Sequence, residues 1–431
     1  MTELGEEMLH IMADGRFKTG AISFYFSIPL ADKCEITAYS LLASVLKRGS
    51  IKYPKTSDLN KRLQELYGAS FEVGVQKRGD VQVLSFRFEF LAGKYVSRCS
   101  ARSGGPESRA QSALVQDDGN ILREIIKLAK DIIWTERAFN NEYVEQEKVN
   151  LEELLASQMN DKKAYAQRRL VEIMCAGEDY AFSEDGYADE LPRLSPKVLE
   201  MTHKELLKKP LEVFATGDID EEDVRGLLEL EIPEIFDIRE SVNAVNRHLG
   251  QESDAVTIEK QAITQSKMCM GFSTGITVKD NDFTALTVYN GVLGGGANSL
   301  LFNNVREKMS LCYYVGTRVD RFKGIMLLSA GIDNDRFEVA RLEIMRQEKR
   351  MRDGEFSEED LQAAKLYIIN SMRSMKDSQA AMEEYAFRQV LSGMDEGIEE
   401  TIGKIERVGR DEVVRVANKV KLETTFLLTS N

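Results

Sequence analysis

The second half of this 431-residue sequence repeats the first, and this limits the possible fold more than any other feature. Residues of the same type recur in the same order at one constant offset, and after a small gap a second set continues the match. The matched pairs are Thr37 and Thr284, Ala38 and Ala285, Val45 and Val292, Leu46 and Leu293, Gly49 and Gly296, Leu63 and Val305, Glu65 and Glu307, Val73 and Val315, and Gly74 and Gly316. We therefore expect two similar α+β units in tandem.

The predicted units are residues 1–236 and 257–431, joined by a linker at 237–256. Residues 237 to about 253 are charged and lack sustained periodicity, which is typical of a connection between domains. In each half, strand patterns and helix patterns follow one another in the same order. Each unit is therefore expected to be a mostly antiparallel sheet packed with helices.

Apolar residues recur with a period of two where we predict strands and with a period near 3.6 where we predict helices. The predicted strands are 21–28, 70–75, 81–90, 211–216, 267–274, 312–319, 324–331 and 424–429. The predicted helices are 36–48, 58–67, 121–133, 141–157, 163–175, 283–293, 336–352 and 413–420. Ser357 and Asp360 form a capping-box pattern that predicts the start of a further long helix. Residues 95–120 are polar and rich in helix-breaking residues, so a mobile surface loop is expected there.

Charge and hydropathy exclude two classes of partner. The 71 acidic residues outnumber the 57 basic ones and give a formal charge of −14, which argues against nucleic acid and against an anionic membrane. No run of about 18 apolar residues could cross a bilayer. The first seven residues are acidic where a signal peptide would be basic and then apolar, so a cytoplasmic protein is expected.

Cysteine and histidine give no sign of a metal site. The five cysteines are scattered and include no C-x-x-C pair, so we expect reduced core residues. The three histidines, His10, His203 and His248, lie far apart in the sequence. They are expected on the surface and not as ligands.

A run of three glycines stands within residues 291–318. Glycine-rich turns often bind phosphate, but a P-loop needs a strand before the glycines and a Lys-Ser/Thr pair after them. Here the glycines follow a helical pattern, and the next residues are Ala297, Asn298 and Ser299. Nucleotide binding is therefore not expected. A short amphipathic helix and then a strand from Cys312 should follow.

This stretch resembles the second-half signature of the pitrilysin/insulinase metallopeptidases, the inverted zincins. The residues that carry the resemblance are Gly294, Gly295, Gly296, Ser299, Leu301, Phe302, Val305, Arg306, Glu307, Lys308 and Tyr313. In that family an Arg and a Tyr seven positions later belong to the catalytic apparatus, and Arg306 and Tyr313 stand at that spacing. The resemblance extends from Ala21 to Phe426 and implies the pitrilysin/mitochondrial-processing-peptidase-like fold.

An inverted zincin also carries H-x-x-E-H on the first helix of its first half. The two His lie on one face of that helix and hold zinc, and the Glu acts as base on the metal-bound water. In this chain the three positions are Tyr39, Leu42 and Ala43. Glu153 stands where the third ligand is expected, with Glu152 one register away, but a solvated acidic helix face is the better explanation of these glutamates. We expect no zinc in this chain and no cleavage by it alone.

The resemblance implies a shared active site. Some members of the family divide the work between a zinc-bearing subunit and a zinc-less one, and this chain is similar to the second kind. Arg306 and Tyr313 would then reach a peptide held in the active site of a zinc-bearing sibling. The chain also resembles zinc-less members from Gram-positive bacteria, some of which are labelled as associated with elongation factor P modification. Alone, the chain could form a homodimer.

Other functions remain open at this stage. Arg306 could be an ordinary helix-surface charge and Tyr313 a half-buried strand residue. The protein could then be a scaffold, as the mitochondrial respiratory core proteins of this family are. It could also be a chamber that binds peptide without cutting it, or a metal enzyme with new ligands.

Overall fold

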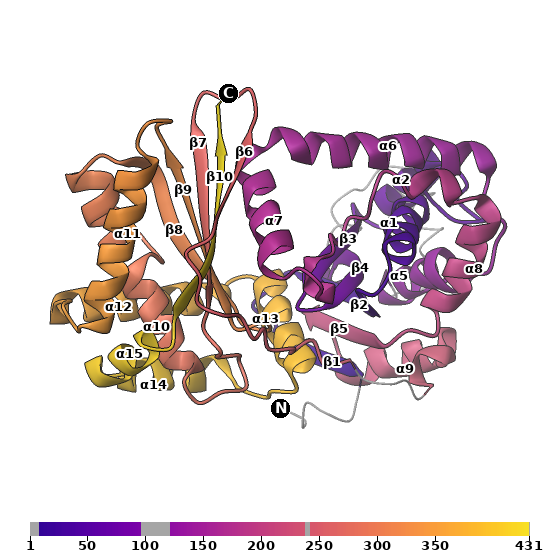
Figure 1. Ribbon diagram of the computed structural model, residues 1–431. Coiled ribbons are helices and arrows are strands. Elements are labelled where there is room, and N and C mark those ends of the chain that lie inside the picture. Colours follow the sequence, from indigo (N-terminus) through magenta and orange to yellow (C-terminus); the bar gives the residue numbers. More distant parts are fainter. Residues whose placement is uncertain (1–7, 96–120, 238–241, 431) are drawn as a thin grey trace, which may run out of the picture. The chain divides into compact units, whose positions relative to one another are not determined.

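The computed structural model describes residues 8–95, 121–237 and 242–430, which form two compact units. Unit 1 contains residues up to 77, 81–153 and 184–242, and unit 2 contains residues 78–80, 154–183 and 243 onward. Two short pieces of the first half, 78–80 and 154–183, thus fold with the second half. Each unit is built around one five-stranded sheet (Figure 1).

The sheet of unit 1 has the strand order β1-β5-β2-β4-β3. Its strands are β1 (Leu9–Ala13), β2 (Thr19–Pro29), β3 (Ser70–Arg78), β4 (Val81–Leu91) and β5 (Leu211–Gly217). Strand β1 runs parallel to β5, whereas β2 is antiparallel to both β5 and β4. The sheet is therefore mixed, with one parallel pair at its edge.

The sheet of unit 2 repeats this topology with the order β6-β10-β7-β9-β8. Its strands are β6 (Val256–Lys260), β7 (Ser266–Ser273), β8 (Cys312–Asp320), β9 (Ile325–Ile332) and β10 (Lys421–Thr429). The edge strand β6 is again the parallel one, and the remaining pairs are antiparallel. The shared strand order confirms the predicted tandem of α+β units.

Unit 1 also contains α-helices. They are α1 (Lys33–Lys47), α2 (Thr56–Glu65), α5 (Ile121–Ala129), α6 (Asn141–Asn160), α8 (Pro196–Leu206) and α9 (Glu221–Glu231). Of these, α1 and α5 contact strand β4 of the sheet. Helix α1 begins where the Asp32 side chain accepts a hydrogen bond from the Glu35 backbone N–H, and it packs against α8 and β4. Helix α5 continues directly into a π-helical turn, η1 (Lys130–Trp134). The last turns of α6 belong to unit 2.

The unit 2 sheet is buried on both faces. One face packs against α10 (Phe283–Leu293), α11 (Phe337–Arg352), α12 (Glu358–Met375), α14 (Ile398–Arg407) and α15 (Arg410–Ala417). The other face packs against α7 (Lys162–Met174) through Leu170, Cys269 and Phe426. Helix α13 (Gln379–Ser392) completes the unit. Because neighbouring residues along a strand point to opposite faces, the central strands β7 and β9 are buried at nearly every position.

Most predicted elements are present, with ends shifted by a few residues. Helix α10 has the predicted bounds, and the capping box at Ser357 and Asp360 opens α12. No periodicity predicted the short edge strands β1 and β6 or the helices α8, α9, α13 and α14. The loop expected at 95–120 lies, apart from Tyr95, outside the described residues.

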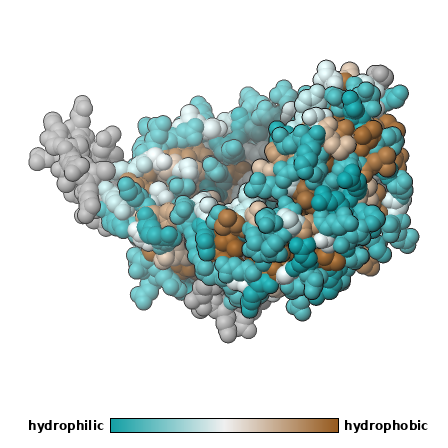
Figure 2. Space-filling view, turned by 90° about the vertical axis from the view of Figure 1, so that its left-hand side faces the viewer, coloured by the Kyte–Doolittle hydropathy of each residue, from teal (hydrophilic) through white to brown (hydrophobic). Residues whose placement is uncertain are grey.

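In the described part of the chain, no helix is both long and apolar enough to cross a membrane. Figure 2 shows one face of the molecule, on which hydrophilic residues predominate and hydrophobic residues appear in small groups between them. Single exposed apolar side chains such as Leu342 on α11 and Tyr367 on α12 are ordinary on a folded protein.

Candidate functional site

Gly291, in the last turn of α10, and Gly294, directly after this helix, allow close packing in unit 2. A Cβ on Gly291 would lie 3.2 Å from Ala364 of α12, and a Cβ on Gly294 would lie 2.6 Å from the Thr317 Oγ1 atom. The carbonyl of Gly294 accepts a hydrogen bond of 3.1 Å from the backbone N–H of Thr317. The turn thus lies against the edge strand β8, and its backbone is engaged with protein atoms.

Arg306 lies on the π-helical segment η5 (Phe302–Lys308), which follows the glycine turn. Its guanidinium carbon lies 4.6 Å from the ring centroid of Phe302, and its Nε atom is 3.7 Å from Glu307. The side chain is 41% exposed. Stacking on Phe302 leaves much of the guanidinium accessible from solvent.

Asn304 fixes η5 onto helix α11. Its Nδ2 group donates to the Leu300 carbonyl at 3.0 Å and to Gln347 Oε1 at 3.1 Å. Gln347 is almost fully buried, and its amide in turn donates to Glu343. A π-helical turn lacks the regular helical ladder, so these side-chain bonds help to hold the segment that carries Arg306.

Tyr313 lies near the start of β8 and is 61% exposed. Its hydroxyl donates a hydrogen bond of 3.0 Å to Asp333, which raises the pKa of the phenol. The phenol therefore keeps its proton at neutral pH. Between η5 and β8, Ser310 has a φ of 50°, a left-handed conformation that costs energy for any residue with a Cβ.

The three positions of the lost zinc motif lie in the core of unit 1. Tyr39, Leu42 and Ala43 on α1 are 1%, 0% and 2% exposed. Burial raises the pKa of Tyr39, so this residue stays a neutral phenol and a poor metal ligand. Leu42 and Ala43 carry no donor atom. Glu153, on α6 in the same unit, is exposed and cannot form a zinc site alone.

The expectation that the histidines lie on the surface is wrong for His203 and His248, and the His10 side chain is only 8% exposed. His203 of α8 is 1% exposed, and its Nε2 atom lies 2.7 Å from the Ile133 carbonyl oxygen. Burial lowers the pKa of His203. His248 is 4% exposed and contacts two carboxylates. Their partners lie at least 70 residues away in the chain, so no local sequence pattern could have revealed this burial.

A cavity of about 280 Å³ in unit 1 is lined in part by His203. Its lining comprises Glu136, Arg137, Ala138, Glu200, His203 and Lys204. Burial lowers the pKa of Arg137 to about 10, but the guanidinium donates to the Gly49 carbonyl at 2.7 Å. Lys204 pairs with Glu136 at 3.1 Å. These groups largely neutralise one another and include no nucleophile paired with a base.

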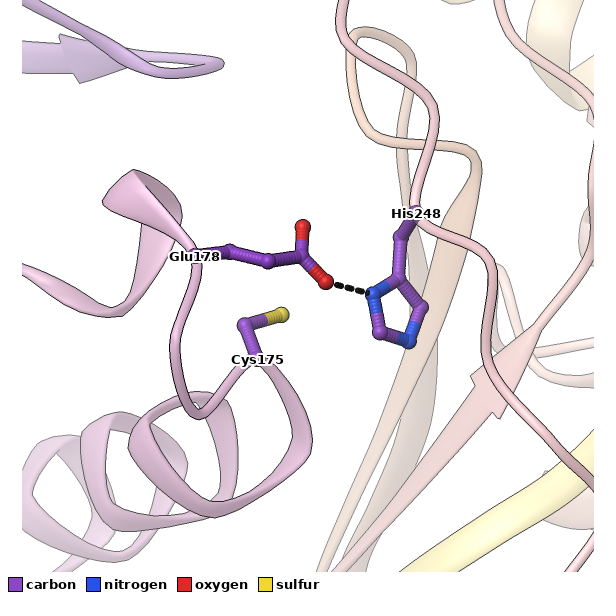
Figure 3. Close-up of side chains that lie close together, drawn as sticks. All are labelled: Cys175, Glu178 and His248. Atoms are coloured by element: carbon purple, nitrogen blue, oxygen red, sulfur yellow. Dashed lines mark hydrogen bonds and ion pairs between the residues drawn. The ribbon is translucent and has the colours of Figure 1, made fainter.

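Cys175, Glu178 and His248 bring three donor atoms within 4.8 Å of one another in unit 2 (Figure 3). Both nitrogens of His248 and both oxygens of Glu178 already have partners. The Nδ1 atom of His248 contacts Glu178, its Nε2 atom contacts Glu423, and the other Glu178 oxygen binds Lys323 at 2.6 Å. The Lys323 ammonium and the His248 imidazole therefore take up the carboxylate oxygens that a metal ion would need. We interpret these residues as an ion-pair cluster and not as a metal site.

Comparison with known proteins identifies relatives across the whole chain. Residues 195–367 match the sequence model of a family described as the peptidase M16 inactive domain. The chain is 31% identical over 426 residues to YmfF of Bacillus subtilis (strain 168), named a probable inactive metalloprotease. That match covers 97% of this chain and 95% of the relative.

Two solved structures have the same fold. A conserved protein from Enterococcus faecalis V583 superposes with a TM-score of 0.86 and 27% identity, covering 98% of this chain and 96% of that one. A protease from Helicobacter pylori superposes with a TM-score of 0.78 and 13% identity, covering 98% and 97%. The pattern of α+β units is thus shared with a protein described only as conserved and with a protein named a protease.

Proposed function

The chain belongs to the peptidase M16 family, and from this premise we propose that it is the zinc-less subunit of a two-chain peptidase or peptide-processing complex. Its partner would be a zinc-bearing sibling with an intact H-x-x-E-H helix. Arg306 and Tyr313 of this chain would act on peptide bound in the partner's active site. The chain itself would hold no zinc.

The contrast in burial carries this proposal. Tyr39, Leu42 and Ala43 are core residues without a ligand set, whereas Arg306 and Tyr313 keep their polar ends at the surface. Neither exposed residue supports the core of unit 2. Their position on adjacent elements, η5 and β8, fits a role toward a molecule outside this chain.

The chemistry of the pair suits a peptide. A protonated phenol can donate to the oxyanion that forms when water attacks a peptide bond, and this charge exists only in the transition state. The guanidinium fork of Arg306 can hold peptide carbonyl groups. The hydrogen bond to Asp333 keeps the Tyr313 proton in place until the peptide arrives, but the phenol must leave Asp333 to donate elsewhere.

The test is reconstitution with the sibling. This chain, purified with the H-x-x-E-H protein of the same cells, is assayed for peptide cleavage and bound zinc, together with each subunit alone. We expect zinc and activity only when the sibling is present, and cleavage only from the complex. Tyr313→Phe should lower kcat by about 10²-fold, the size seen when one oxyanion donor is removed, without changing the complex mass.

Tyr367→Phe is the matched control, because Tyr367 is also an exposed tyrosine of unit 2. It should leave turnover unchanged. If Tyr313→Phe behaves like this control in an active complex, the shared-site proposal is wrong and a scaffold role replaces it. If no sibling copurifies and the chain forms only a homodimer that binds peptide without cutting it, a peptide-binding role replaces it.

A further inference from the structure

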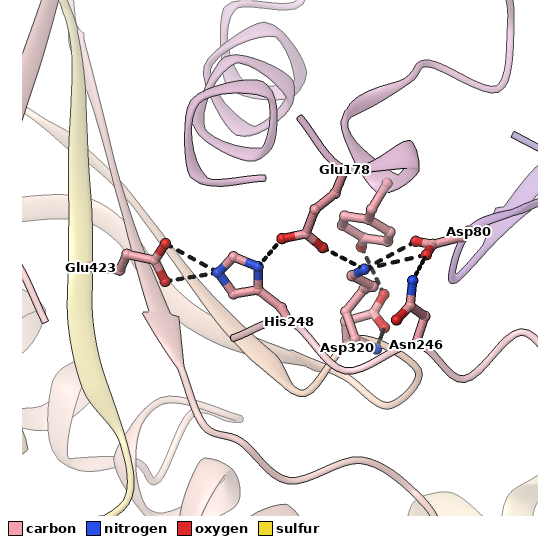
Figure 4. A network of polar contacts seen from close by, with 8 residues as sticks. Asp80, Glu178, Asn246, His248, Asp320 and Glu423 are labelled. Atoms are coloured by element: carbon pink, nitrogen blue, oxygen red, sulfur yellow. Dashed lines mark hydrogen bonds and ion pairs between the residues drawn. The ribbon is translucent and has the colours of Figure 1, made fainter. Parts of the chain in front are cut away.

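A cluster of buried charges lies where several distant segments of unit 2 meet (Figure 4). The ionisable side chains of the cluster are Asp80, Cys175, Glu178, Tyr180, His248, Asp320, Lys323 and Glu423. They come from the β3–β4 turn, the segment after α7, the segment between residues 243 and 255, the β8–β9 turn and β10. None of these contacts involves Arg306, Tyr313 or the lost zinc motif.

Lys323 is the first cation of the cluster and is completely buried. Its ammonium lies 2.6 Å from Glu178 and 3.1 Å from Asp80. Burial opposes the charge of Lys323, but these two carboxylates outweigh it and raise its pKa. Tyr180 lies beside it and donates to Asp320 at 2.8 Å, so the hydroxyl and that carboxylate satisfy each other.

His248 is the second cation and is the group that can change its charge near neutral pH. Its Nδ1 atom contacts Glu178, and its Nε2 atom lies 2.9 and 3.1 Å from the two Glu423 oxygens. A carboxylate can only accept, so both contacts are hydrogen bonds only when the imidazole carries two protons. The Glu423 bond raises the pKa of His248, burial opposes this, and Glu178 adds to the increase.

The backbone around His248 depends on the same cluster. The backbone N–H of His248 donates to the Lys323 carbonyl at 2.8 Å, and that of Asn246 donates to Phe322 at 3.2 Å. The Asn246 side chain also donates to Asp80. Segment 243–250 has no helix or strand of its own, and the bonds to the cluster hold its part around Asn246 and His248. Outside the cluster, the Ala244 N–H donates to the Leu391 carbonyl at 3.0 Å, and Arg247 pairs with Asp280 at 2.7 Å.

We propose that His248 acts as a proton-operated clamp that fastens segment 243–250 to unit 2 and releases it as the pH rises. With His248 charged, two cations face the three carboxylates of Asp80, Glu178 and Glu423. When His248 loses a proton, Lys323 alone faces these three charges, and one ring nitrogen turns a lone pair toward a carboxylate. One of the two hydrogen bonds is then lost and the segment opens.

The direction of the pH dependence follows from the protonation state of His248 that makes both hydrogen bonds. The protonated imidazole is the form held in the folded chain, so the stabilising effect is complete below the ordinary histidine pKa of about 6.5. It is lost as the pH rises through the higher pKa of the folded state. Between about 6.5 and the folded value, protection of the segment should fall by up to about tenfold per pH unit, and above the folded value it should no longer depend on the His248 proton.

Gly250 offers a substitution that disturbs the clamp without removing any charged group. A Cβ at this position would lie 1.7 Å from a Glu423 carboxylate oxygen and 2.7 Å from His248 Nε2. In Gly250→Ala, Glu423 must therefore move off the imidazole. Gly403→Ala is the matched control, because Gly403 in α14 of the same unit has open space at the Cβ position.

The experiment uses the full chain with carbon-labelled histidine rings and follows each signal by NMR from pH 5 to pH 9. The chain has only three histidines, so His248→Gln assigns the signal. We expect His248 to titrate above about 6.5, Gly250→Ala and Glu423→Gln to lower its midpoint, and Gly403→Ala to leave it unchanged. A His248 midpoint at or below that of free histidine would overturn the proposal.

Hydrogen exchange of residues 243–250, corrected for the intrinsic effect of pH, tests the release itself. We expect protection at pH 6, its loss at high pH, and low protection at both pH values in His248→Gln. His10→Gln is the control, because His10 contacts a single carboxylate, Glu212, at 2.7 Å in unit 1. Protection independent of pH would refute the clamp, and so would stoichiometric zinc binding that displaces the His248 proton.

Discussion

Helix α1 of unit 1 carries the positions of the lost zinc motif, and the η5–β8 segment of unit 2 carries Arg306 and Tyr313. The two places differ in where these side chains lie. The motif positions of α1 point into the core, and all three are at most 2% exposed. Arg306 and Tyr313 point outward from the edge of the second sheet. The same fold thus presents core residues in one unit and accessible polar groups in the other.

The difference shows at which positions a substitution would act on the stability of the fold. Leu42 and Ala43 now fill space between α1 and its neighbours, so changing them should affect folding. Tyr313 contacts little beyond Asp333, so changing it should affect only what the protein binds. Substitutions at the two places can therefore separate a folding role from a functional one.

The largest effect is expected from restoring the zinc motif. Tyr39→His, Leu42→Glu and Ala43→His together place a carboxylate and two imidazoles at buried positions. The free energy of unfolding should fall by about 4 kcal/mol or more, because a buried charge without partners is costly. Urea unfolding measures this loss. A folded variant that binds one zinc ion would show that unit 1 lacks only the ligand side chains. The contrast between a buried motif in unit 1 and an accessible pair in unit 2 would then be wrong.

The two buried histidines should respond to pH in opposite directions. His203→Gln should cost about 1–3 kcal/mol at pH 8, where the buried neutral imidazole is hydrogen-bonded. Burial lowers the pKa of His203, so its contribution is complete above about 6.5 and is lost as the pH falls through the lower folded value. Urea unfolding at pH 5 and pH 8 should therefore show a smaller cost at pH 5. His248→Gln should show the reverse trend, and parallel trends would contradict both assignments.

A smaller, stabilising effect is expected from a substitution of Ser310, which lies between Arg306 and Tyr313 in the chain. Ser310 holds a left-handed φ of 50° between η5 and β8. Glycine adopts this conformation without the Cβ clash, so Ser310→Gly should raise the free energy of unfolding by up to about 1 kcal/mol. Ser310→Val should lower it. Thermal unfolding of the two variants provides the measurement, and equal stabilities would show that the turn is not strained.

The smallest effect on stability is expected at the pair itself. Arg306→Lys and Tyr313→Phe should leave the urea midpoint of the isolated chain unchanged, because both side chains are solvent-accessible and their contacts are at the surface. Far-UV circular dichroism during urea titration measures this. A clear loss of stability would mean that these residues support the fold, and reduced activity could then no longer be attributed to substrate contact.

Local patterns were sufficient to predict elements whose signal lies within a few residues. The helix at Phe283–Leu293 and the cap at Ser357 follow from periodicity and from hydrogen bonds between near neighbours. The strand order common to both sheets agrees with the repeat found in the sequence. The short strands β1 and β6 were missed because five residues give too little alternation to recognise.

The sequence alone determined the tandem repeat, the family resemblance and the loss of the H-x-x-E-H ligands, because each depends on residue identity and spacing. Only the tertiary structure decided that α7 packs on the second sheet and that His203 and His248 are buried. It also decided that Lys323 is fully buried and pairs with carboxylates in place of water. The reason is physical: burial and charge depend on partners brought together across the fold, such as Glu423 and His248, which lie 175 residues apart in the chain.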